Sequence, residues 1–289
     1  MIFSKRKFNK HKIKYVLFLA VITFICYNIF LNYSGKDKYD KPIIYKNLNL
    51  KKLNRLTFSY FLKNFGDEKI WVDYSTPNVT DMEKKETTML LKEYINDKIN
   101  DKNWYFKTED KYDFLKDIGK LNFVKKQFET KFNGKNIPGK IIKTNVSFWM
   151  GGKNSTTSWH NDTEDLSFIY VIQGKKKINF ISPKYNENMY EKNMYTHHAN
   201  WSHVNFKNPD YEKHPKYKQV KITSYTLEKG DCCYIPPYWW HSVENLDKTI
   251  AVTYHIYRLK YVLLQPIIDF FRIIYYYLNG AKMYYREEE

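Results

Sequence analysis

Two histidines and one aspartate are the residues of this sequence best suited to hold a metal ion. His160 and Asp162 are separated by a single residue in the segment SWHND. On a β-strand, side chains two positions apart point to the same face, so an imidazole and a carboxylate would project together. His241 comes much later, at the end of the segment YIPPYWWH. Two imidazoles and a carboxylate make the facial triad that binds Fe(II) and leaves coordination positions open.

The residues just before His241 predict a rigid approach to it. Pro236 and Pro237 fix the backbone φ angle and remove two N–H donors, and Trp239 and Trp240 are large, stiff side chains. A metal ligand needs such a frame, because its ring nitrogen must be presented at a fixed angle. The alternative is a chance His-x-Asp pair on the surface, since the chain has 8 histidines.

The pattern of the chain changes near residue 141. Beyond it, short alternating segments separated by Gly and Pro turns are typical of an antiparallel sandwich or barrel. The polar and aromatic segment 185–217 predicts a long ordered insertion in this barrel. Before residue 141, the sequence predicts an amphipathic helix around Phe58, a strand over 70–75 and a helix over 82–100.

The two ends of the chain carry apolar runs. Residues 15–35 contain no charge and follow a basic segment. Because about 20 apolar residues cross a bilayer core of roughly 30 Å, we predict a transmembrane signal anchor and a single-pass membrane protein with a cytosolic N-terminus. A cleaved signal peptide is the alternative. Residues 261–289 predict a C-terminal helix that forms a homodimer contact, binds a partner or packs on its own domain.

The composition of the chain bears on the class of molecule that the protein binds. The chain has 289 residues and a formal net charge of +17, which would suit nucleic acid or an anionic surface. The lysines are spread along the whole sequence, and no arginine-rich block or basic helix stands out, so we predict no nucleic-acid partner. The 3 cysteines form neither a disulfide framework nor a zinc-finger spacing.

Several motifs occur together in an order that resembles a known family. They are MGGKNSTTSWHND, VIQGKKKINFISP, NPDYEKHPKY, LEKGDCCYIPPYWWHSVENL and AVTYHIY. This order is similar to that of the JmjC-related, cupin-like Fe(II)/2-oxoglutarate oxygenases, the group that contains the asparaginyl hydroxylase of hypoxia-inducible factor. The resemblance implies a double-stranded β-helix, a jelly-roll barrel with the metal at its open mouth.

We therefore expect a mainly β fold with α additions. The predicted divisions are a basic tail (1–14), a transmembrane anchor (15–35), a linker (36–41), a small α/β lobe (42–140), the barrel (141–260) and a helical tail (261–289).

The resemblance also implies roles for individual residues. His160, Asp162 and His241 match the Fe(II) ligands, with 2-oxoglutarate and O₂ as co-substrates. Thr157 matches a hydroxyl that contacts a co-substrate carboxylate, and Lys176 matches the lysine that pairs with the distal carboxylate of 2-oxoglutarate. An ammonium there would offset the cost of burying the anion.

Four other positions bear on the assignment of the 2-oxoglutarate site. Lys175 and Lys177 are the alternatives to Lys176, although strand alternation should turn them the other way. Ser167 and Tyr254 stand where the family often has asparagines around the co-substrate, which could alter the affinity for 2-oxoglutarate.

The expected activity is hydroxylation of a protein side chain by a membrane-anchored oxygenase, with succinate and carbon dioxide as co-products. Three alternatives are a cupin-like barrel that binds a ligand or partner without catalysis, a metalloenzyme that needs no 2-oxoglutarate, and a tethered scaffold. His197 and His198 could also ligate a metal, but a solvated loop is the commoner place for such a pair.

Overall fold

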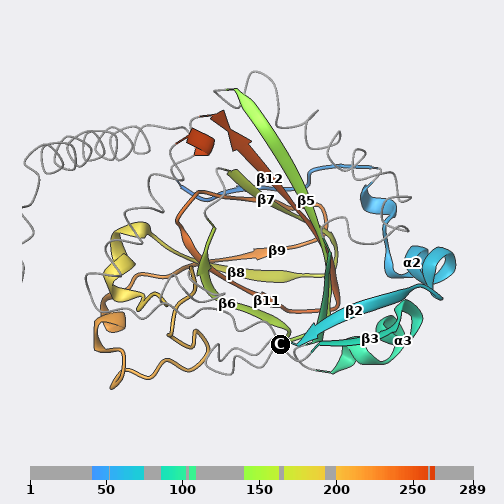
Figure 1. The fold of residues 1–289 in the computed structure, drawn as a ribbon, viewed down its shortest axis with the longest axis horizontal. Coiled ribbons are helices and arrows are strands. Elements are labelled where there is room, and N and C mark those ends of the chain that lie inside the picture. The colour runs from blue at the N-terminus through green and yellow to red at the C-terminus, as the bar shows by residue number, and fades with distance from the viewer. Residues whose placement is uncertain are drawn as a thin grey trace, which may run out of the picture.

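The structure is a computed structural model that describes residues 41–51, 53–74, 86–101, 104–108, 140–162, 166–192, 200–259 and 261–263. It is mainly β, and its two antiparallel sheets lie face to face (Figure 1). The larger sheet has 8 strands in the order β1-β10-β7-β12-β5-β4-β2-β3, and the smaller has 4 in the order β6-β11-β8-β9. This arrangement is consistent with the predicted cupin jelly roll.

The bounds of the elements are as follows. The larger sheet contains β1 (Ile43–Tyr45), β2 (Lys69–Tyr74), β3 (Glu86–Leu90), β4 (Trp104–Thr108), β5 (Ile141–Gly151), β7 (Leu166–Gln173), β10 (Cys232–Ile235) and β12 (Thr249–Arg258). The smaller contains β6 (Thr156–Asn161), β8 (Lys176–Ile181), β9 (Thr223–Leu227) and β11 (Trp240–Asn245). The helices are α2 (Phe58–Phe65) and α3 (Leu91–Asn96), with short 3-10 turns η1 (Leu53–Arg55), η2 (Lys98–Asn100), η3 (Pro183–Asn188) and η4 (Pro215–Gln219).

The central strands β7, β10 and β12 of the larger sheet are buried on both faces. On its outer face, Phe168 and Tyr254 belong to a core cluster that also contains Phe61 of α2 and Tyr94 of α3. On its inner face, Val171 of β7 packs with residues of the smaller sheet in a second cluster. Successive residues of a strand point to opposite faces, so the apolar residues of β7 divide between the two clusters, whereas those of β12 belong to the outer one. The polar residues discussed below lie on the inner face.

The segments before residue 141 join the same sheet. Strand β1 pairs with β10 at one edge, and β4, β2 and β3 extend the other edge beyond β5 (Figure 1). An ion pair of 2.7 Å between Lys46 Nζ and Asp231 Oδ2 ties β1 to the turn before β10. The strands expected in a small N-terminal lobe are therefore continuous with the barrel wall, while the domain boundaries themselves stay a prediction.

The predicted single-pass membrane location requires correction. A spanning helix needs about 20 apolar residues. Over the described residues, no helix is long and apolar enough to cross a membrane, and α2 has only 8 residues. The segments 1–14 and 15–35, and the tail from residue 264, lie outside the described part. The membrane assignment is withdrawn, and the homodimer contact of the tail stays a prediction.

Candidate metal centre

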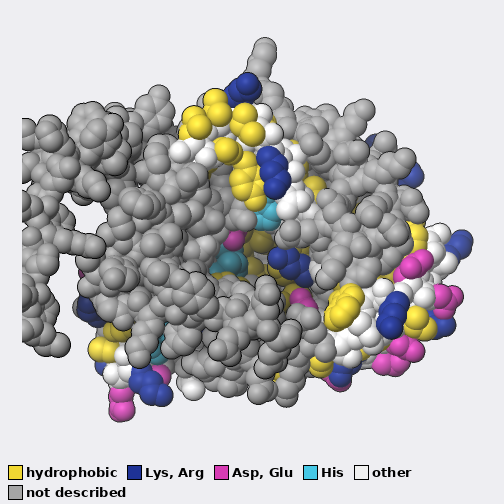
Figure 2. Space-filling view, in the orientation of Figure 1, with side chains coloured by type: hydrophobic (Ala, Val, Ile, Leu, Met, Phe, Trp, Pro, Cys, Tyr) yellow, Lys and Arg dark blue, Asp and Glu magenta, His cyan; other side chains and the backbone are white. Residues whose placement is uncertain are grey.

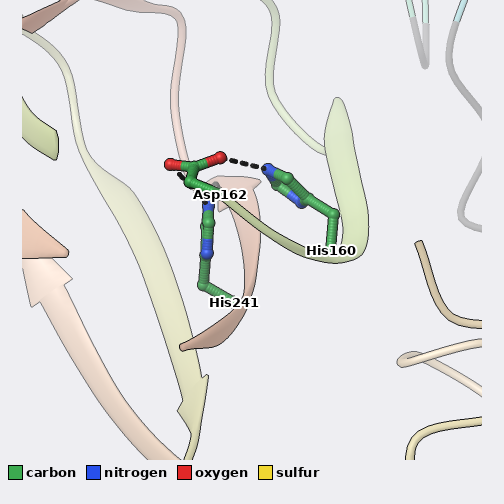
Figure 3. Close-up of side chains that lie close together, drawn as sticks. All are labelled: His160, Asp162 and His241. Carbon is green, nitrogen blue, oxygen red and sulfur yellow. Dashed lines mark ion pairs between the residues drawn. The ribbon is translucent and has the colours of Figure 1, made fainter. Parts of the chain in front are cut away.

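The structure brings His160, Asp162 and His241 together. His160 lies near the end of β6, Asp162 follows that strand, and His241 is the second residue of β11. Strands β6 and β11 are antiparallel neighbours in which His160 and His241 are direct partners, and their ring centroids lie 4.1 Å apart. In Figure 3 dashed lines join the Asp162 carboxylate to both rings, one oxygen to each. Residues far apart in the sequence therefore meet because adjacent strands pair in this register.

One donor atom from each of the three side chains lies within 4.8 Å of the others. The Nε2 atoms of both histidines are 3.8 Å from an Asp162 carboxylate oxygen, Oδ1 for His160 and Oδ2 for His241. The His241 side chain is 3% exposed, whereas those of His160 and Asp162 are 17% and 19% exposed. Figure 2 shows a hollow on this face in which histidine, acidic and basic side chains gather. The cluster is thus enclosed and still open to a small molecule.

Backbone carbonyl groups fix the orientation of both rings. His160 Nδ1 lies 2.8 Å from Ser158 O, and His241 Nδ1 lies 3.0 Å from Trp239 O. A carbonyl oxygen only accepts, so each Nδ1 carries the proton and donates it. Each Nε2 then keeps a free lone pair on the side of Asp162. A hydrogen bond from one ring nitrogen thus fixes the tautomer and leaves the other nitrogen ready to bind a metal.

The Pro-Pro turn before β11 explains the rigid approach to His241. Tyr238 takes a left-handed backbone conformation with φ of 62°. Its N–H donates to the backbone oxygen of Asp162 at 3.0 Å. The next residue, Trp239, supplies the carbonyl that holds the His241 ring. One turn therefore contacts two members of the cluster. The proline and tryptophan content predicted a rigid approach for His241 alone.

The ionisation of the cluster suits a divalent cation. Burial is the main cause that lowers the pKa of His160 to about 3, and the nearby His241 acts in the same direction. Burial raises the pKa of Asp162, but the nearby His241, His160 and other polar groups together outweigh it, and the net direction is downward. At neutral pH, His160 is therefore a neutral imidazole and Asp162 a carboxylate. Metal ligands must be deprotonated in this way, so the donor set fits Fe(II).

The insertion 185–217 covers the outer edge of β6. Trp201 forms an antiparallel bridge with His160, and their rings stack at 4.9 Å with an interplanar angle of 21°. Trp159 and Trp240, which flank the two histidines, donate indole N–H groups to Tyr217 and Asn186. The described residues of the insertion are thus ordered against the cluster, as predicted. Residues 193–199, including His197 and His198, lie outside the described residues.

Replacing Trp201 with alanine is expected to weaken Co(II) binding about tenfold, a typical loss when an outer partner of a ligand is removed. The His160 ring would lose the surface that holds its plane. Trp201→Phe keeps an aromatic face and should bind nearly as well as wild type. Titration of the apoprotein, followed by the visible absorption of Co(II), measures both. Equal affinities for Trp201→Ala and wild type would contradict this role.

Thr157 and Lys176 also lie on the inner face of the smaller sheet. Thr157 of β6 pairs with Val243 of β11, and Lys176 of β8 pairs with Asn245 of β11. Between His241 and Val243, β11 has one residue where β6 has two, which makes a bulge in β6. Because of this bulge, Thr157 and His160 face the same side although they are three positions apart.

Lys176 is a buried cation. It is 8% exposed, and its Nζ donates to Asn245 Oδ1 at 2.8 Å. Burial lowers its pKa to about 8. Lys175 is exposed and forms an ion pair of 2.8 Å with Glu228, as strand alternation predicted.

Ser167 and Tyr254, the two departures from the family pattern, lie on opposite faces of the larger sheet. Ser167 is fully buried on the inner face, and its Oγ lies 2.9 Å from His255 Nδ1. Tyr254 lies instead in the outer core with Phe168, away from the cluster. The prediction that Tyr254 contacts the co-substrate is therefore not supported. Alternation along β12 places Thr253 and His255 beside Ser167 instead.

Three residues near the cluster were missed by the sequence analysis. They are Trp201, Asn245 and His255. Every second residue of a strand faces the same side, so the strand segment AVTYHIY could have indicated that His255 faces inward. Trp201 and Asn245 depend on contacts between distant segments, for which the sequence carries no local signal.

Comparisons with known proteins agree with this fold. A sequence model described as a cupin-like domain matches residues 34–258. The chain is 28% identical to JmjC domain-containing protein A of Dictyostelium discoideum over 226 residues, which cover 75% of this chain and 87% of that protein.

Two further relatives are matched over shorter segments. JmjC domain-containing protein D of the same organism is 30% identical over 107 residues, which cover 37% of this chain and 24% of that protein. Human HSPB1-associated protein 1 is 25% identical over 140 residues, which cover 48% of this chain and 26% of that protein. This chain therefore spans about a quarter of the length of these two relatives. The narrower resemblance to the hypoxia-inducible-factor hydroxylase stays a prediction.

Proposed function

The chain belongs to the cupin-like domain family, and on that premise we propose that it is an Fe(II)- and 2-oxoglutarate-dependent oxygenase that hydroxylates a protein side chain. The observation that carries the proposal is the His160–Asp162–His241 cluster, in which both free Nε2 atoms lie on the side of one carboxylate. The JmjC names of the relatives support the same class of enzyme. The choice of a protein substrate follows from the family resemblance.

His160, Asp162 and His241 would hold the metal through two nitrogens and one oxygen. When bound, Fe(II) would supply the redox chemistry that places one atom of O₂ in the hydroxyl group of the product and the other in succinate, as 2-oxoglutarate loses CO₂. The contribution of the chain is geometric and electrostatic. Its backbone carbonyls fix the rings, and the apolar residues between the sheets, such as Phe180, limit the access of water.

Lys176 would bind the distal carboxylate of 2-oxoglutarate, together with Thr157. An ammonium has three N–H donors. Within the described residues Asn245 accepts one of them, so two remain for a ligand. A dianion that approaches this buried cation would offset the unfavourable free energy of burying a lone charge.

The affinity for 2-oxoglutarate is expected to depend on the charge of Lys176. The pKa of this ammonium in the free protein is about 8. Below that pH the group is charged and the dissociation constant should be flat. Above it the dissociation constant should rise about tenfold per pH unit, because a proton must first be taken up. Binding measured from pH 6.5 to 9.5 tests this, with Lys176→Met, which should bind weakly at every pH, as the control.

The release of labelled succinate from 2-oxoglutarate is the direct test of the proposed function. The iron-loaded protein should release succinate in the presence of O₂, and a chelator or Zn(II) substitution should stop it. Release that is unaffected by metal removal would refute the proposal.

A second candidate is a barrel that binds metal and ligand without turnover. It is favoured by the Ser167–His255 pair, in which two inner-face groups bond to each other. Binding of 2-oxoglutarate to the metal-loaded protein without succinate release would indicate this function.

A further inference from the structure

A chain of three hydrogen bonds begins at the buried Lys176 ammonium. Lys176 Nζ lies 2.8 Å from Asn245 Oδ1, and Asn245 Nδ2 lies 2.6 Å from Ser155 Oγ. Ser155 Oγ in turn lies 2.9 Å from the backbone oxygen of Gly152. The side chains of Lys176, Asn245 and Ser155 are all buried. The chain therefore joins strands β8 and β11 to the turn between β5 and β6.

The donors and acceptors of this chain fix the orientation of the Asn245 amide. An ammonium only donates, and a carbonyl oxygen only accepts. Lys176 must therefore face the oxygen of the amide, which turns the amide nitrogen toward Ser155. The Ser155 oxygen accepts from that nitrogen and donates its own proton to Gly152 O. The amide is thus oriented at both of its ends.

The backbone of the β5–β6 turn holds Asn245 in the same place. The Asn245 N–H donates to Ser155 O at 2.9 Å, and its carbonyl oxygen accepts from the Asn154 N–H at 2.8 Å. A Cβ atom added at Gly151 would meet both Asn245 Nδ2 and Ser155 Oγ, so the glycine leaves the room that the amide occupies. Asn245 is therefore placed by the turn and presents its amide oxygen to Lys176.

A neutral partner is unusual for a buried lysine. Burying a lone charge is unfavourable, so a buried cation is ordinarily paired with a carboxylate. The exposed Lys175 has such a partner in Glu228, at 2.8 Å. Among the described residues, no carboxylate pairs with Lys176. The amide of Asn245 orients the ammonium but leaves its charge without a counter-charge from the protein.

We propose that Asn245 is a positioning residue that makes the site selective for a ligand with a distal carboxylate, because it fixes the Lys176 ammonium and leaves its charge for the ligand to balance. The inference rests on the proposed function and adds to it a residue that acts through Lys176. The counter-anion of the buried lysine then arrives with 2-oxoglutarate. Ser155 and Gly151 contribute by holding the amide in place.

Asn245→Asp is the decisive variant, because it keeps the size of the side chain and supplies the counter-charge from the protein. We expect it to weaken the binding of 2-oxoglutarate to the Co(II)-loaded protein at least about 100-fold, since two carboxylates would compete for one ammonium. Oxalate can chelate the metal but has no distal carboxylate, so its affinity should match that of wild type. The visible absorption of bound Co(II) measures the binding of both ligands.

The stability of the metal-free protein separates this role from a structural one. The new carboxylate would pair with Lys176, so the thermal unfolding midpoint of Asn245→Asp should be no lower than that of wild type. Ser155→Ala is a second variant, which changes no charge. It removes the acceptor that holds the amide nitrogen, and it should weaken 2-oxoglutarate binding about tenfold without an effect on oxalate.

Asn208→Asp is the matched control, because it adds the same charge at an exposed asparagine of the insertion. It should bind both ligands like wild type. Equal 2-oxoglutarate affinity in Asn245→Asp and wild type would overturn the role of Asn245, and so would an equal loss of 2-oxoglutarate and oxalate binding. If wild type bound oxalate but not 2-oxoglutarate, the proposed function would be the claim that fails.

Discussion

Replacing Asp162 with alanine is expected to abolish metal binding and succinate release together. The substitution removes the anionic ligand and leaves two neutral nitrogen donors, from His160 and His241, to hold the ion. Loss of an outer partner of a metal ligand reduces affinity 10–100-fold, so loss of a ligand should exceed about 100-fold. Co(II) titration and the succinate assay measure the two effects separately.

Asp247→Ala is the matched control for this variant. Asp247 is exposed in the turn between β11 and β12, so its removal should change neither measurement. Metal affinity in Asp162→Ala within a factor of two of wild type would remove the carboxylate from the ligand set and leave the proposed activity without its metal site.

Replacing Lys176 with methionine is expected to weaken 2-oxoglutarate binding on the order of 10²–10³-fold. Breaking a buried charge pair by removing one partner costs about 3–5 kcal/mol. Metal affinity should be unchanged, because Lys176 bonds to Asn245 rather than to the triad. Lys175→Met is the neighbouring control, since that exposed side chain pairs with Glu228. Equal 2-oxoglutarate affinity in Lys176→Met and wild type would favour a metalloenzyme that does not use this co-substrate.

The same substitution should reveal what the buried lysine does to stability. Its pKa is about 8 in the folded protein against an ordinary value of 10.5. The folded state therefore releases a proton more easily than the unfolded state, which makes folding unfavourable by about 3 kcal/mol below pH 8. This penalty declines between pH 8 and 10.5 and is absent above that range.

The free energy of unfolding, measured across this pH range, shows whether the charge of Lys176 destabilises the folded protein. At pH 7, Lys176→Met should be at least as stable as wild type, even though Asn245 loses a hydrogen bond. As the pH rises from 8 to 10.5, the free energy of unfolding of wild type should increase by about 3 kcal/mol relative to that of the variant. Parallel curves would show that the lysine is not desolvated in the folded protein.

The alternation of side chains along strands led to several of the correct predictions. It placed His160 and Asp162 together, turned Lys176 inward and Lys175 outward, and predicted the strand over 70–75 that appears as β2. These predictions succeeded because burial on a sheet face is a local, two-residue pattern. The motif order then identified the fold.

The predictions that failed needed information from other strands. Residues 82–100 were expected to form one helix, but 86–90 form β3, which pairs with β2, and α3 begins only at Leu91. Helical periodicity continues through this boundary, and the break is set by pairing with β2. The Tyr254 prediction failed by one position on β12, where a shift of one residue exchanges the inner and outer faces.

The bulge in β6 gives the spacing between Thr157 and His160 a meaning of its own. In a regular strand, a three-residue interval would send these two side chains to opposite surfaces. The additional residue at this point turns an odd interval into a shared orientation. The reading frame of the strand, as well as the identity of its residues, therefore decides whether hydroxyl and imidazole reach one cavity. Shortening this segment by a single residue would leave every amino-acid type in place and still separate the two groups.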